Sequence, residues 1–124
     1  MTRYMGLVKM AEGITEPPPQ SLMNAMDEFV AKSAANGSFL DGGGLFGTED
    51  AINFVVRKGE MTRVDGPYAE AKEVVGGWAL LQFESEEEAV ENMREMAQLH
   101  VDHWPSQELV ITLRQVAEGP PPGE

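Results

Sequence analysis

The chain has 124 residues, which fits one domain, and its hydrophobic fraction of 42% is too high for a disordered protein. Nine basic and 21 acidic residues give a formal charge of −12, and the basic residues are scattered, which excludes direct binding to the phosphate backbone of a nucleic acid. Without cysteine the chain has no disulfide, no thiolate nucleophile and no cysteine-bound metal. No apolar run approaches the ~20 residues of a membrane span, and nothing resembles a signal peptide, so we expect a cytoplasmic protein.

Turn and cap residues divide the chain into elements. The prolines at 17–19 exclude a helix before Ser21, whose hydroxyl is a suitable N-cap, and Asn36 followed by Gly37 ends that helix. Ser85 begins a second helix with the form of a capping box. In chain order the patterns first predict a strand over 4–10, a helix over 21–36 and an irregular strand from 39 into the glycines at 42–44. A hairpin follows, with strands over 52–58 and 61–64 and its turn at Gly59-Glu60. The last predicted elements are a strand over 74–83, a helix over 85–103 and a strand over 109–116.

This order is a βαββαβ pattern with an extra hairpin in the middle. It predicts the ferredoxin-like α+β fold, an antiparallel sheet with two helices on one face. In the strand over 74–83, Trp78 and Leu80 alternate with Ala79, Leu81 and Phe83, so both faces of the sheet are apolar. We therefore expect a homodimer whose sheets pack face to face, a dimeric α+β barrel. The alternative is that the glycine-rich segments fold back over the second face.

The stretch VDGPYAEAKEVVGGW, residues 64–78, resembles the signature of the DGPF-type, YCII-related domain proteins. The segments RYMGLVKM, LDGGGL, LHVDHWP and ELVITLRQV extend the resemblance to about residues 3–116, with Tyr68 where Phe is usual and Ala71 where Thr is usual. We assign residues 1–117 to this domain and expect residues 118–124 to be a disordered tail. The resemblance implies a ferredoxin-like dimer of the muconolactone-isomerase-like kind, and association of some relatives with extracytoplasmic-function sigma factors. A catalytic His and Asp suggested for YCII proteins do not map onto this chain.

Asp65 and the charged residues after it are candidates for an active-site edge. Asp65 precedes a Gly-Pro turn, where its carboxylate either caps the turn or acts as a base. Glu70 and Lys72 either contact a ligand or belong to a solvated charge run. For Lys72 we favour a salt bridge or anion contact over a Schiff base.

His100 is the first candidate for acid–base chemistry. Helical spacing places it with Met93, Ala97 and Trp104 in the middle of the buried face of its helix, and places His103 at the edge. The alternative role for His100 is a hydrogen-bonded core residue. The two histidines lie roughly 60° apart around the helix and no acidic pattern accompanies them, so we expect neither a metal nor another cofactor.

Two functions remain open at this point. The first is binding of a small molecule in a cleft between helices and sheet, lined by Tyr4, Trp78 and His100 and edged by Asp65, Glu70 and Lys72, with isomerase-like or lyase-like acid–base chemistry. The second is a non-catalytic regulatory or scaffold dimer, associated with a sigma factor as the resemblance suggests. A third, structural interpretation is a dimer whose pocket is filled by its own side chains.

Overall fold

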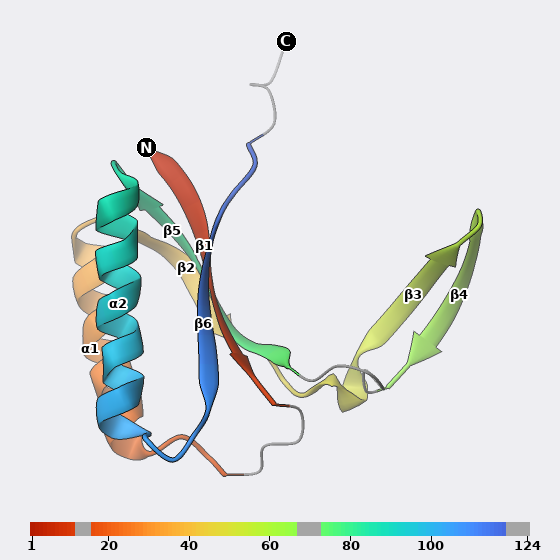
Figure 1. The fold of residues 1–124 in the computed structure, drawn as a ribbon, viewed down its shortest axis with the longest axis horizontal. Helices are drawn as coiled ribbons and strands as arrows, with labels where there is room; N and C mark the ends of the chain where they lie inside the picture. Colours follow the sequence, from red (N-terminus) through yellow and green to blue (C-terminus); the bar gives the residue numbers. More distant parts are fainter. Residues whose placement is uncertain (12–15, 67–72, 119–124) are drawn as a thin grey trace.

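The computed structural model describes residues 1–11, 16–66 and 73–118. Two layers make up the body of the molecule, a four-stranded sheet and a pair of helices, and a separate two-stranded hairpin stands beside it (Figure 1). The elements in chain order are β1 (Thr2–Met10), α1 (Gln20–Ala35), β2 (Phe39–Gly44), the 3-10 turn η1 (Thr48–Asp50), β3 (Ile52–Arg57), β4 (Glu60–Asp65), β5 (Val74–Phe83), α2 (Glu86–His103) and β6 (Leu109–Gln115).

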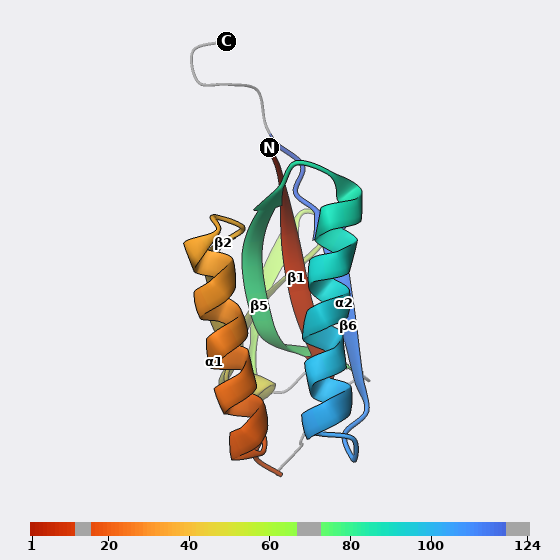
Figure 2. The ribbon, with the colours of Figure 1, turned by 90° about the vertical axis from the view of Figure 1, so that its left-hand side faces the viewer.

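The main sheet has the strand order β2-β5-β1-β6, and every pair in it is antiparallel. Both helices lie on the same face of this sheet (Figure 2). With the hairpin left out, the chain is a βαββαβ unit whose first strand is central, which confirms the ferredoxin-like α+β prediction.

The core lies between the sheet and the helices. Ala79, Leu81 and Phe83 of β5 contribute to it, as the alternation in their strand predicted. Tyr4 of β1 packs its ring 6.2 Å from that of Phe83 and is almost fully buried. The buried cluster consists of Tyr4, Leu81, Phe83, Ala89, Met93 and Met96, with partly buried side chains of α1, β1, β2, β5 and β6 packed against it.

The two helices begin differently. Ser85 caps α2 as predicted, because its Oγ accepts a hydrogen bond from the Glu88 N–H at 3.2 Å. The predicted cap at Ser21 is wrong, since α1 begins one residue earlier, at Gln20, and no side chain caps it. The Pro19 carbonyl accepts hydrogen bonds from Leu22 and Met23 instead, and proline is well suited to a helix start because its φ is already set.

The second face of the main sheet carries no helix. By register Met5 lies opposite Leu80, and Leu7 opposite Trp78, on this helix-free face. The glycines at 42–44 do not fold over it but extend the sheet as the edge strand β2, with the irregular register that the sequence predicted. Large apolar side chains therefore occupy both faces, and only one of them is covered by helices.

The hairpin β3–β4, which we call the arm, forms a sheet of its own. Its turn is at Lys58-Gly59, one residue before the predicted position, since Arg57 pairs with Glu60. Both turn residues have positive φ (51° and 78°), the conformation that matches the twist of a hairpin. The arm stands on the side of the main sheet opposite the helices (Figure 1).

Candidate functional site

His100 lies in the last part of α2, on the side of the helix that faces β6. Met93 and Met96, which precede it on this side, are buried in the core, and His100 is half-buried. Its ring atom Nδ1 is 2.9 Å from the backbone oxygen of Met96. The position agrees with the inward orientation that helical spacing predicted.

The contact with Met96 decides which ring nitrogen is available. A carbonyl oxygen can only accept a hydrogen bond, so Nδ1 carries the hydrogen in the neutral ring and donates it. The other nitrogen, Nε2, then has a free lone pair. His100 is thus both a hydrogen-bonded structural residue and a group that is able to accept a proton.

Trp104 follows directly after α2 and is 5% exposed. Its backbone N–H donates to the His100 carbonyl at 2.9 Å, and its own carbonyl accepts from Gln107 at 3.1 Å. These bonds hold the chain in a tight turn after the helix. The indole Nε1–H is buried and has no hydrogen-bond partner in the part of the chain that the structure describes. A buried donor without an acceptor costs free energy, so an acceptor placed at this N–H would be favourable.

His100 and Trp104 border the same surface hollow. It has a volume of about 340 Å³ and lies between the end of α2 and the start of β6. The other lining residues are largely apolar: Ala97, Val101, Pro105, Gln107, Leu109 and Ile111. His100 and Trp104 thus line one hollow whose wall is otherwise mostly apolar.

The other predicted site residues lie elsewhere or outside the described residues. Tyr4 is part of the core, and Trp78 belongs to the helix-free face, so neither lines the hollow at His100. Asp65 ends β4 in the arm, where its Oδ1 accepts a hydrogen bond from Arg63 Nε at 2.8 Å. Glu70 and Lys72 are not among the described residues. The arm that carries Asp65 lies apart from α2 (Figure 1).

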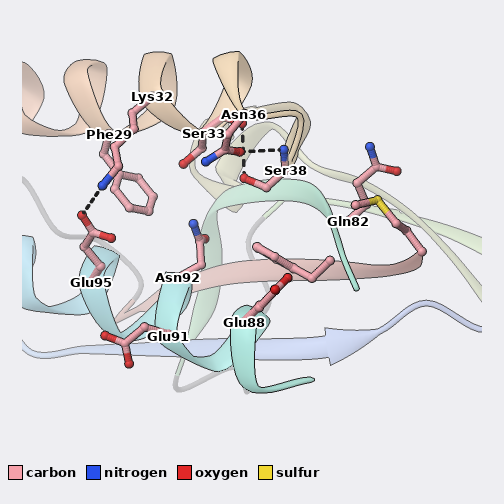
Figure 3. Close-up of a pocket in the computed structure, with 12 residues that line it drawn as sticks. Phe29, Lys32, Ser33, Asn36, Ser38, Gln82, Glu88, Glu91, Asn92 and Glu95 are labelled. Atoms are coloured by element: carbon pink, nitrogen blue, oxygen red, sulfur yellow. Dashed lines mark hydrogen bonds and ion pairs between the residues drawn. The ribbon is translucent and has the colours of Figure 1, made fainter. Parts of the chain in front are cut away.

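A second hollow, of about 360 Å³, lies between α1 and α2 where β5 ends (Figure 3). Several of its polar groups are partnered within the fold: Ser38 Oγ donates to the Ser33 carbonyl at 3.2 Å, and Asn36 Oδ1 accepts from the Ser38 N–H at 3.0 Å. Lys32 Nζ and Glu95 Oε1, 3.3 Å apart, bridge the two helices. These contacts hold the end of α1 against its surroundings, so we interpret this hollow as structural.

A third hollow is apolar. It measures about 260 Å³, lies between the helices and the sheet, and is lined in part by Gly6, Val8, Met26, Val30 and Met96. This is the place where the sequence predicted a cleft, and Trp78 is among its lining residues as predicted, whereas Tyr4 and His100 are not. No charged side chain lines it, so we do not assign chemistry to this hollow.

Metal binding and membrane insertion have no support in the described residues. Within 1–11, 16–66 and 73–118, no three His, Cys, Asp or Glu side chains are grouped as a metal site requires. In the same ranges no helix has the length and hydropathy needed to cross a bilayer.

The sequence model of the YCII-related domain family matches residues 2–106. The chain belongs to this family. The match confirms the family that the DGPY segment indicated, and it includes the arm and the segment from His100 to Trp104. It ends before β6, which the structure nevertheless places beside β1 in the main sheet of this YCII-related domain. No curated protein matches the chain significantly.

Sequence reasoning identified His100 but missed the state of the Trp104 indole. Periodicity placed Trp104 on the buried face, and the structure confirms that burial. Whether a buried N–H has an acceptor depends on residues from other elements, and no pattern in the local sequence reports it.

Proposed function

We propose that this YCII-related protein binds a small molecule in the hollow at His100 and Trp104, and that His100 accepts a proton from it. The observation that carries the proposal is the pair of unused groups in one place, the Nε2 lone pair and the Trp104 indole N–H. Because the indole nitrogen is shielded from solvent, a ligand that accepts its hydrogen must displace lining side chains as it enters.

These two groups suit a carbonyl compound. A carbonyl or carboxylate oxygen would accept the indole hydrogen, while Nε2 would take a proton from the neighbouring carbon or from a hydroxyl group. A donor at the oxygen stabilises the negative charge that forms there when the proton leaves. This is the step that isomerases and lyases acting next to a carbonyl share. Asp65 does not line the hollow, so proton transfer is assigned to His100.

The chain supplies an internal control for a binding experiment, because it has two tryptophans. In a ¹H–¹⁵N spectrum each gives one indole signal. With small keto acids as probes, at millimolar concentration, we expect the Trp104 signal to move and the Trp78 signal to stay. If no probe moves the Trp104 signal, or if both signals move equally, the binding site is wrong.

Proton transfer is tested without knowing the natural reaction. In D₂O, a proton acceptor beside a carbonyl exchanges the neighbouring C–H for C–D, and proton NMR follows the loss of signal. We expect exchange of the bound keto acid above the buffer rate, and a return to the buffer rate in His100→Asn with binding retained. Equal exchange by the variant would remove the role of His100 but leave the binding site.

We also infer that the protein is a homodimer that joins its main sheets by their helix-free faces. Support comes from the half-buried Met5, Leu7, Trp78 and Leu80 on that face, which no helix covers. Substitution of Leu80 by Lys would place a charge in the contact and is expected to yield monomers. Light scattering that gives the mass of a single chain, 13.6 kDa, for the unmodified protein at micromolar concentration would contradict the dimer.

The alternative function is a non-catalytic regulatory or scaffold dimer. One observation favours it, the large apolar surface that remains exposed on the arm. The keto-acid experiments discriminate the two functions: a scaffold leaves the Trp104 signal and the C–H exchange unchanged, and keeps its partner binding in His100→Asn.

A further inference from the structure

One face of the arm is mostly apolar. By register it carries Ile52, Phe54 and Val56 of β3 and Met61 of β4, together with the ion-paired Arg63 and Asp65 opposite Phe54 and Ile52. The four apolar residues are between 57% and 71% exposed. Exposed apolar residues gathered on one face in this way indicate a partner.

Among the residues that the structure describes, no other strand pairs with this hairpin. It is hydrogen-bonded as a separate two-stranded sheet, and Figure 1 shows it standing apart from both layers of the body. At its base the hairpin is closed by a further hydrogen bond, from the Gly66 N–H to the Ala51 carbonyl at 2.9 Å. A two-stranded hairpin by itself is at best marginally stable in water, so a contact outside the described residues of this chain is needed to hold it.

The arm lies on the side of the helix-free face. Helices cover one side of the main sheet, and the arm stands on the opposite side (Figure 1). Phe46, in the segment that leads from β2 to the arm, is 98% exposed and adds a further apolar side chain. A second copy that packs on the helix-free face would therefore have the arm at its flank.

The contact area is compatible with a second copy. The face of four strands, about 4.8 Å apart and roughly seven residues long, covers on the order of 450 Å² in projection. The accessible surface buried in a face-to-face contact exceeds this projection because side chains project from the sheet. The arms add further area towards the roughly 800 Å² per partner that specific interfaces bury.

We propose that the arm of each chain docks its apolar face, Ile52, Phe54, Val56 and Met61, on the body of a second copy, so that the two copies clasp each other reciprocally. The two-fold symmetry of a homodimer provides one receiving surface for each arm. The inference rests on the proposed dimer and adds to it that the arms contribute to the contact between the two copies.

Matched substitutions on the two faces of the arm test this. The double variant Phe54→Ser, Val56→Ser removes the apolar face, and Val64→Ser alters an exposed valine on the opposite face. Neither changes the core, so circular dichroism is expected to be unchanged. We expect the dissociation constant of the dimer, from sedimentation, to rise about tenfold or more in the double variant and less than about threefold in the control.

Cross-linking provides a second measurement that does not depend on affinity. Since the chain has no cysteine, Val56→Cys and Val64→Cys each introduce a single attachment point for a thiol-reactive benzophenone. In a mixture of ¹⁵N-labelled and unlabelled chains, mass spectrometry separates links between copies from links within one. We expect links between copies from position 56, and few from position 64.

The outcomes separate the arm from the dimer. Links from position 56 only within its own chain, or a dimer whose dissociation constant the double variant leaves unchanged, would overturn the arm contact while the sheet contact stands. A monomer in light scattering would overturn both. Loss of the dimer in Leu80→Lys alone, with the arm variants unaffected, would show that the sheet face is sufficient and would likewise reject the clasp.

Discussion

Nδ1 of His100 lies 2.9 Å from the backbone oxygen of Met96, one helical turn earlier in α2. This contact orients the ring of His100, which lines the same hollow as Trp104. A single side chain thus hydrogen-bonds to its own helix through Nδ1 and keeps Nε2 for chemistry. The relationship is the basis of the proposed proton transfer.

The first prediction concerns the tautomer of His100. We expect long-range ¹H–¹⁵N correlations, recorded at a pH where the ring is neutral, to show the hydrogen on Nδ1. His100→Asn keeps a donor near the Nδ1 position, whereas His100→Ala removes it and is expected to lower the free energy of unfolding by about 0.5–1.5 kcal/mol in urea titrations. A hydrogen found on Nε2 would contradict the bond to Met96.

The second prediction compares two serines at helix starts. Ser85→Ala removes the hydroxyl that accepts the Glu88 N–H, so the free energy of unfolding is expected to fall by about 1 kcal/mol. Ser21→Ala replaces an exposed residue already inside α1 and is expected to be neutral or slightly stabilising, because alanine is the better helix former. Equal losses in urea titrations of the two variants would show that both serines are caps.

The third prediction concerns neighbouring glycines of β2. A Cβ at Gly42 would lie 2.8 Å from the Trp78 backbone oxygen and 2.9 Å from the Phe39 ring, closer than atoms can pack. We expect Gly42→Ala to cost about 1–3 kcal/mol of unfolding free energy. At Gly43 the nearest contact of such a Cβ is 3.6 Å, an ordinary distance, so Gly43→Ala is the control and should change stability by less than about 1 kcal/mol. Similar thermal midpoints for the two variants would contradict the close approach at Gly42.

The fourth prediction concerns pH. The Arg3 guanidinium donates two hydrogen bonds to the Glu118 carboxylate, at 2.6 and 2.7 Å, and holds the pKa of Glu118 below its usual range. Because the folded-state pKa is lowered, the stabilisation from this pair is present at neutral pH and is lost as the pH falls through the folded-state value. An NMR titration of Glu118 should show the low midpoint, which Arg3→Gln should return to the ordinary value of about 4.3 and Arg114→Gln should leave unchanged. An ordinary midpoint in the unmodified protein would contradict the ion pair.

Local patterns predicted the elements of this fold well. Alternation in Val74–Phe83 and helical spacing in α2 report which side of each element is apolar, and the structure buries those sides. The two errors, Ser21 as a cap and the hairpin turn at Gly59-Glu60, are each a shift of one or two residues at an element end. At such ends several residues are nearly equivalent in propensity, and packing decides among them.

The candidate site was only partly predictable. Helical spacing alone predicted that His100 faces inward, because the direction of its side chain depends only on its own helix. Tyr4 and Trp78 were predicted to line the same cleft as His100. Neither lines the hollow at His100, since Tyr4 lies in the core and Trp78 on the opposite face of the sheet. For Asp65 the prediction as a catalytic residue stays open, and the structure adds its ion pair with Arg63.

The sequence by itself determined the class of fold, the family and the apolar character of both sheet faces, because these follow from residue spacing and from the DGPY segment. Only the tertiary structure decided that Trp104 has a buried N–H without an acceptor among the described residues, that the helix-free face and the arm lie on one side, and that His100 shares its hollow with β6. These relationships join residues far apart in the chain. They depend on how separate elements pack, which no local pattern of residues encodes.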